Sequence, residues 1–140
     1  MPDNPIDRQI DKTYELNFPV ARVYAAWVSS DTVIAPATAM DVLAEVGGHY
    51  RLIMDLPDFK GRNEGVFRAV EPEQRLCYTW EWNNDGEVSN IDVRFSATPT
   101  GCRIDLSHSG FHSDASAERH ATGWDSYMAG FEALLKSEGH

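Results

Sequence analysis

The chain has 140 residues, 42% of them apolar and 11% aromatic, which allows one sizeable core but not two ordinary domains, so a single domain over residues 1–140 is expected. Its 22 acidic against 12 basic residues give a net charge of −10, which disfavours nucleic acids and anionic membrane surfaces as partners. No apolar run approaches the roughly 20 residues of a membrane helix, and the residues from Met1 to Pro5 lack the features of a secretory signal, so a cytoplasmic protein is expected.

The first predicted elements are a strand and a short helix. From Ile10 to Phe18, apolar and polar residues alternate, which is the period of a half-buried strand. Pro19 ends this strand and suits the first turn of a helix. Helical spacing then continues through Val28, with apolar residues at Val20, Val23, Tyr24 and Trp27.

Turn residues divide the middle of the chain into six further predicted strands. These are residues 39–46, 48–56, 62–71, 74–83, 88–98 and 101–109, and the breaks between them are rich in Gly, Pro, Asn and Asp. A parallel crossover needs a dozen or more residues, so neighbours joined by such short turns are expected to pair antiparallel. These six strands are expected to form a meander.

The last segment has the period of a long amphipathic helix. Ser113 or Asp114 is the expected cap at its start, and Gly139 is expected to end it after about 24 residues, near 36 Å. Its apolar stripe comprises Ala117, His120, Ala121, Trp124, Tyr127, Met128, Phe131, Leu134 and Leu135.

Alternation also predicts which face of the sheet is dry. The even positions from Leu76 to Trp82 share one face, and comparable faces run through Ile91, Val93 and Phe95 and through Cys102, Ile104, Leu106 and His108. A sheet and a helix that each have one apolar face must cover each other. We therefore expect an α+β helix-grip fold: a curved antiparallel seven-stranded sheet wrapped around a long C-terminal helix, with short helices after the first strand.

Several stretches resemble one known family. They are residues 18–27 (FPVARVYAAW), 47–51 (GGHYR), 65–67 (GVF), 70–76 (VEPEQRL), 101–111 (GCRIDLSHSGF) and 123–124 (GW). In this order they are similar to the family of homologues of the activator of the Hsp90 ATPase. The resemblance covers nearly the whole chain and implies a START-like (SRPBCC, Bet v 1-like) fold with a hydrophobic pocket between sheet and helix.

One segment departs from the pattern of that family. Relatives often carry a Trp after the first helix, where this chain has the small residues Ala35, Pro36 and Ala37. These residues predict a more open pocket mouth.

The predicted ligand-binding residues are inward-facing aromatic and polar side chains that suit a flat or apolar ligand. They are Tyr14, Tyr50, Trp80, Trp82, Phe95, His108, Trp124, Tyr127, Met128 and Phe131. The alternative is a solid aromatic core, because periodicity does not distinguish residues that line a cavity from residues that fill it.

Other titratable residues favour structural roles. His108 suits a ligand contact or general acid–base work, but a structural hydrogen bond is favoured. The spacing of His108, His112 and His120 with Asp114 matches no strong metal motif, and we expect neither metal nor cofactor.

Five further residues are expected to have structural roles. Lys12 is expected to extend to the sheet rim, and Asp55 and Asp58 to lie in a solvated turn. Cys77 and Cys102 are interpreted as core thiols.

Three functions follow as hypotheses. The first is a protein that binds a small hydrophobic or aromatic molecule, such as a lipid or polyketide-like metabolite. The resemblance adds a co-chaperone-like interaction module with a chaperone partner, and analogy of fold adds a polyketide cyclase-like enzyme. A homodimer through an exposed sheet edge is compatible with the sequence.

Overall fold

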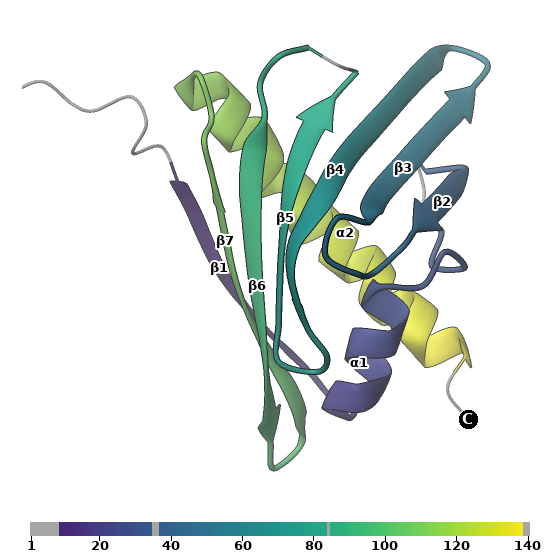
Figure 1. The fold of residues 1–140 in the computed structure, drawn as a ribbon. Helices are drawn as coiled ribbons and strands as arrows, with labels where there is room; N and C mark the ends of the chain where they lie inside the picture. Colours follow the sequence, from purple (N-terminus) through teal and green to yellow (C-terminus); the bar gives the residue numbers. More distant parts are fainter. Residues whose placement is uncertain (1–8, 35–36, 84, 139–140) are drawn as a thin grey trace, which may run out of the picture.

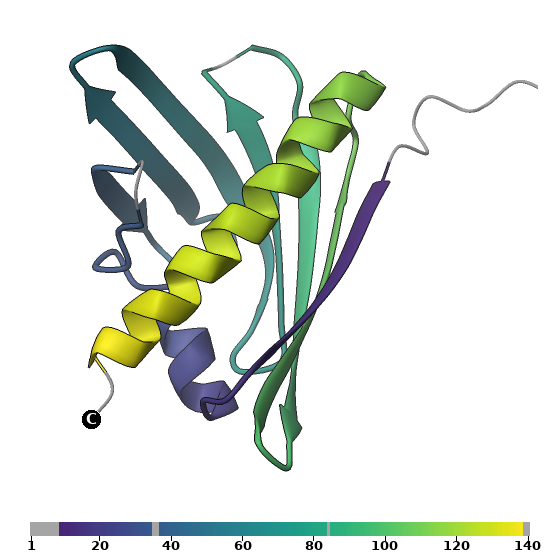
Figure 2. The ribbon, with the colours of Figure 1, turned by 180° about the vertical axis from the view of Figure 1, so that it is seen from behind.

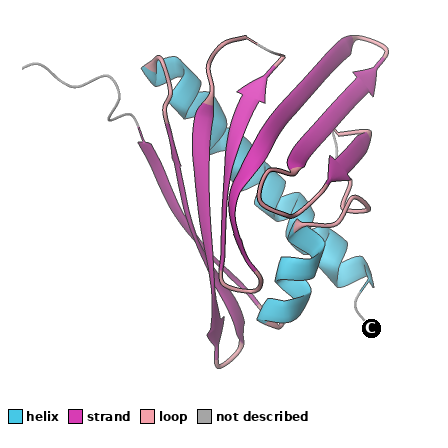
Figure 3. Ribbon diagram, viewed as in Figure 1, coloured by secondary structure: helices cyan, strands magenta, loops and turns pink. Residues whose placement is uncertain are grey.

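A computed structural model describes residues 9–34, 37–83 and 85–138. Seven strands form one antiparallel sheet in the order β1-β7-β6-β5-β4-β3-β2, so neighbours in sequence are neighbours in the sheet except for β1, which pairs with β7 (Figures 1 and 3). The strands are β1 Gln9–Leu16, β2 Ala39–Val42, β3 His49–Leu56, β4 Phe59–Glu71, β5 Arg75–Trp82, β6 Ser89–Thr98 and β7 Gly101–Ser109.

Two helices complete the described fold, α1 Val20–Trp27 and α2 Asp114–Glu138. The long helix α2 crosses one face of the curved sheet diagonally, and α1 lies beside its C-terminal half (Figure 2). Ser113 caps α2, because its Oγ accepts the Ser116 N–H at 3.0 Å. The predicted helix-grip fold is confirmed, with one short helix after the first strand in the described residues.

Two strand boundaries differ from the prediction because the turns are tighter than expected. The predicted strand 39–46 ends at Val42, since Gly48 N–H bonds Glu45 O and closes a turn before β3. The predicted strand 62–71 begins at Phe59, because Pro57 and Asp58 alone form the hairpin turn.

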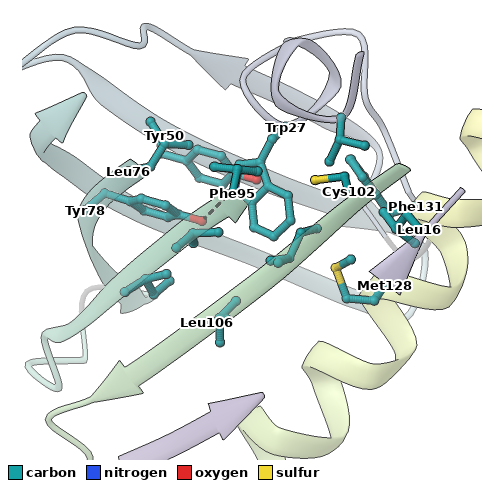
Figure 4. Packing of buried hydrophobic residues seen from close by; sticks show 14 of the residues in the cluster. Leu16, Trp27, Tyr50, Leu76, Tyr78, Phe95, Cys102, Leu106, Met128 and Phe131 are labelled. Atoms are coloured by element: carbon teal, nitrogen blue, oxygen red, sulfur yellow. Dashed lines mark hydrogen bonds between the residues drawn. The ribbon is translucent and has the colours of Figure 1, made fainter. Parts of the chain in front are cut away.

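The interior is densely packed where α1 meets the sheet and α2. Trp27 is 1% exposed, and its ring contacts Phe95 at 5.7 Å and Phe131 at 5.5 Å between centroids. Its indole N–H donates to the Tyr78 hydroxyl at 3.3 Å, the dashed line in Figure 4. We call the region of Trp27, Phe95, Phe131 and Leu135 the packed end of the interior.

Some predictions fall outside the described residues: the N-terminal segment Met1 to Pro5, the residues Ala35 and Pro36, and the helix end at Gly139. Among the helices that are described, none combines the length and the apolar content that crossing a bilayer requires.

Candidate functional site

Away from the packed end, a half-open cavity of about 450 Å³ lies between the sheet and α2. The sheet contributes alternate residues of three neighbouring strands, and α2 contributes residues spaced three and four apart, as one face of a helix requires. The sheet residues are Tyr50, Leu52, Met54, Asn63, Tyr78, Trp80 and Trp82; the helix residues are Ser116, Arg119, His120, Gly123, Trp124, Ser126 and Tyr127. Ile34, Ala37, Asp85 and Glu87 complete the lining.

The cavity face of α2 carries a glycine with open space beside it. A Cβ added at Gly123 would meet no atom within 4 Å. Two turns later, at Gly130, α2 packs closely against Ile34, since a Cβ added at Gly130 would lie 2.5 Å from Ile34 Cγ2. Glycine inside a helix costs about 1 kcal/mol relative to alanine, so Gly123 keeps the space open at a cost to helix stability.

The inner walls are aromatic and uncharged. Tyr50 stacks on Tyr78 with ring centroids 4.9 Å apart, and Trp80 lies 5.7 Å from Tyr50. Burial raises the pKa of Tyr50 to about 12, and it raises the pKa values of Tyr78 and Tyr127 well above the ordinary phenol range. These phenols are therefore neutral at any physiological pH.

The side chains of the lining that can carry charge gather at one end, formed by the β5–β6 loop and the first turns of α2. They are Asp85, Glu87, Arg119 and His120. Glu87 accepts the Ser116 hydroxyl at 2.6 Å and the His112 N–H at 2.7 Å, which ties the loop to the helix. Burial alone would raise the pKa of Glu87, but these hydrogen bonds outweigh it and lower the pKa.

His108 is a buried hydrogen-bond junction next to the cavity. An indole N–H can only donate, so the contact of Trp124 Nε1 with His108 Nδ1 at 3.0 Å makes Nδ1 the acceptor. The proton is then on Nε2, which donates to Ser89 Oγ at 2.7 Å, and Ser89 donates to Trp80 O at 3.1 Å. Burial, with a smaller contribution from nearby His120, lowers the pKa of His108 to about 3. Both ring nitrogens are engaged, so the imidazole acts as a neutral bridge between strands and helix.

Five of the ten residues predicted to bind a ligand line the cavity: Tyr50, Trp80, Trp82, Trp124 and Tyr127. The other five lie elsewhere. Tyr14 donates to Asp125 at 2.9 Å where β1 meets α2, and His108 forms the junction described above. Phe95, Met128 and Phe131 are buried in the hydrophobic core.

Several lining residues were not among the predicted ligand-binding residues. Leu52 and Met54 have the inward parity of β3, a signal that was present in the alternation. Asn63 has inward parity too, but a polar residue does not stand out in an apolar pattern. Gly123 lies on the stripe of Ser116, His120 and Tyr127, and an empty position in a helix carries no periodic signal.

The remaining candidate residues occupy structural positions. Lys12 pairs with Asp125 of α2 at 3.1 Å, and Asp55 pairs with Lys60 across the β3–β4 turn. Both cysteines are free thiols, but only Cys102 is buried; Cys77 is partly exposed, so the prediction of a core thiol is wrong for Cys77. In residues 9–34, 37–83 and 85–138, no three His, Cys, Asp or Glu side chains gather as metal ligands.

Sheet, helix and interior cavity together define the helix-grip class, and comparison with known proteins agrees. The sequence profile described as Activator of Hsp90 ATPase homolog 1-like protein matches residues 17–136, and the chain belongs to that family. Among proteins with curated functions, no similar sequence was found.

Solved structures of the same fold come from several bacteria. Protein MLL2253 of Mesorhizobium loti is 21% identical, with a TM-score of 0.79 over 92% of this chain and 97% of its own. The AHSA1-like protein of Aeromonas hydrophila is 21% identical, with a TM-score of 0.78 over 94% of each chain. Protein CV1439 of Chromobacterium violaceum is 21% identical, with a TM-score of 0.78 over 91% of this chain and 96% of its own. At these identities the likeness shows the fold.

Proposed function

We propose that this protein binds a small hydrophobic or aromatic molecule in the cavity between the sheet and α2. The observation that carries the proposal is a cavity of about 450 Å³ whose inner walls are aromatic and neutral. Ligand pockets in proteins commonly measure about 300–1,000 Å³ and have such walls. Membership of a family whose fold commonly holds hydrophobic ligands supports it.

The energetics of the cavity favour an uncharged ligand body. Each Å² of apolar surface removed from water contributes about 25 cal/mol, and the aromatic walls already stand in place before binding. A charged group against Tyr50 or Tyr127 would lose its hydration without gaining an ionic partner. Charge on a ligand is tolerated only at the end with Glu87 and Arg119.

The geometry favours binding over cyclase-type chemistry. His108 was the acid–base candidate of the sequence, but its two ring nitrogens are held by Ser89 and Trp124. Its lowered pKa makes it a weak base near neutral pH. Binding needs no such group, whereas proton transfer to a ligand would require the junction to break.

A neutral fluorescent probe tests the proposal. N-phenyl-1-naphthylamine is expected to bind the wild-type protein with enhanced, blue-shifted emission and one site per chain. Gly123→Leu places a side chain in the empty space and is expected to abolish binding, while Gly123→Ala keeps it. Absence of binding to the wild type, or equal binding by the Leu variant, would remove the proposal.

A further inference from the structure

Asn63 is a polar residue in an apolar row of the cavity wall. Across β3, β4 and β5, it pairs with Leu52 on one side and Trp82 on the other, so the three side chains share the inward face. All three line the cavity, and Asn63 is 7% exposed. An asparagine here is unexpected, because strands disfavour it and both neighbours are apolar.

The side-chain oxygen of Asn63 has no hydrogen-bond partner in the part of the chain that the structure describes. Other buried polar side chains are satisfied: Thr32 donates to Ala26 O at 2.6 Å, and Thr79 Oγ1 accepts the Val66 N–H at 2.9 Å. The same holds for Ser89, His108 and Ser116. Buried polar groups in proteins are nearly always paired, so an unpaired one that faces a cavity indicates a partner that enters the cavity.

A second unpaired group belongs to the helix side of the same cavity. The Tyr127 hydroxyl is buried and has no hydrogen bond of good geometry with a described residue, although the phenols of Tyr50 and Tyr78 lie near it. A third such atom, His49 Nε2, is on the outer face of the sheet, 3.1 Å from Asp41. The two unpaired groups of the interior thus belong to one cavity, one on β4 and one on α2.

We propose that Asn63 is the specificity residue of the cavity and that it selects aromatic ligands carrying a hydroxyl group. The inference rests on the proposed ligand-binding function and narrows its ligand class. A ligand hydroxyl donates to Asn63 Oδ1, and the Tyr127 hydroxyl donates to an oxygen of the ligand. A pure hydrocarbon leaves both groups unpaired, and a site built to pair a polar group discriminates against a ligand that lacks it.

A matched pair of probes tests this directly. 2-Naphthol and 2-methylnaphthalene have the same ring system and differ in a hydroxyl against a methyl group. Their affinities are measured by displacement of N-phenyl-1-naphthylamine. We expect the wild-type protein to bind 2-naphthol roughly 5- to 100-fold more tightly, the ratio that an unpaired buried hydrogen-bonding group implies.

Variants test whether Asn63 and Tyr127 cause the preference for 2-naphthol. Asn63→Leu has similar volume and is expected to bring the two affinities to within about twofold, while raising the unfolding temperature of the ligand-free protein, because an unpaired polar group is removed. Tyr127→Phe is expected to reduce the ratio in part. Asn90→Leu, the same substitution at an exposed position of β6 outside the cavity, is the control and is expected to leave the ratio unchanged.

The outcomes separate this inference from the proposed function. If the dye and both naphthalenes bind but the wild type shows no preference, as when a trapped water satisfies Asn63, the inference is overturned and ligand binding stands. A preference that persists in Asn63→Leu also overturns it. If the dye itself does not bind, both fall. The wild-type ratio needs no variant, so the inference remains testable even if Asn63→Leu does not fold.

Discussion

The packed end and the cavity are built from the same residue types with opposite results. At the packed end, Trp27 is 1% exposed and is surrounded by Phe95 and Phe131. At the cavity, Trp80 and Trp82 keep part of their surface free and border a space of about 450 Å³. Aromatic content therefore does not decide whether the interior of this fold is solid.

The difference lies in what the helices contribute. The helix α1 inserts Trp27 between the sheet and α2, and α2 there carries Phe131 and Leu135. Over the cavity, α2 carries Trp124 and Tyr127 but also Gly123, and no helix is inserted among the described residues. The insertion of α1 fills one end, whereas the other end has no inserted helix and keeps free space, where side chains lose packing contacts.

The largest difference in stability between the two ends is expected when a tryptophan is replaced by alanine. Trp27→Ala is expected to destabilise the protein by about 3–5 kcal/mol, because it removes a fully packed ring. Trp82→Ala removes the same atoms from a partly exposed wall and is expected to cost clearly less, while weakening binding of N-phenyl-1-naphthylamine. Urea denaturation measures the first quantity and dye titration the second. Equal destabilisation by the two variants would contradict the distinction between the ends.

The histidine junction predicts a dependence of stability on pH. The pKa of His108 is about 3 in the folded protein and near 6.5 when unfolded, so the unfolded state binds the extra proton between these values. The free energy of unfolding is therefore highest above pH 6.5. As the pH falls from 6.5 to about 3, the free energy of unfolding decreases by up to about 1.4 kcal/mol per pH unit. Between pH 6.5 and 4.5 the loss reaches up to about 3 kcal/mol.

Urea denaturation at pH 6.5, 5.5 and 4.5 measures this slope. The variant His108→Gln removes the buried imidazole and is expected to reduce the slope between pH 6.5 and 4.5. Proton NMR adds an independent check, because the His108 ring signals are expected not to titrate down to pH 5. A flat profile, or a His108 ring that titrates near pH 6.5, would show that the imidazole is not held neutral.

The smallest predicted effect on stability concerns alanine substitutions at two glycines of α2. Gly123→Ala is expected to stabilise the protein by about 1 kcal/mol, because the new methyl meets no atom and the helix gains propensity. Gly130→Ala gains the same propensity but places its methyl 2.5 Å from Ile34 Cγ2, so it is expected to stabilise less or to destabilise. Thermal unfolding of both variants decides the order; a larger gain at Gly130 would show that the contact with Ile34 is not tight.

Much of the fold followed from the sequence because alternation and helical spacing are physical requirements of burial. The inward faces of β5, β6 and β7 and the stripe of α2 were predicted correctly for this reason. The residues at turns were harder, since Phe59 and Val42 lie where hydrogen-bonded turn geometry, not periodicity, sets the strand end.

The candidate site was predictable only in part. Phe95 and Trp80 both have inward parity, yet one fills the core and the other lines the cavity, because α1 covers the first and not the second. The alternation of residues along a strand does not indicate whether a helix such as α1 covers that part of the sheet. Asn63 and Gly123 were missed for a related reason: one is polar, the other has no side chain, and neither contributes to an apolar pattern.

A titration with 2-naphthol, followed by the indole N–H signals of the four tryptophans, shows whether a ligand binds in the cavity and not at the packed end. The signals of Trp80, Trp82 and Trp124 are expected to shift with a common affinity, and the signal of Trp27 is expected to shift least. Unchanged indole signals at saturation, or a largest shift at Trp27, would contradict binding in the cavity.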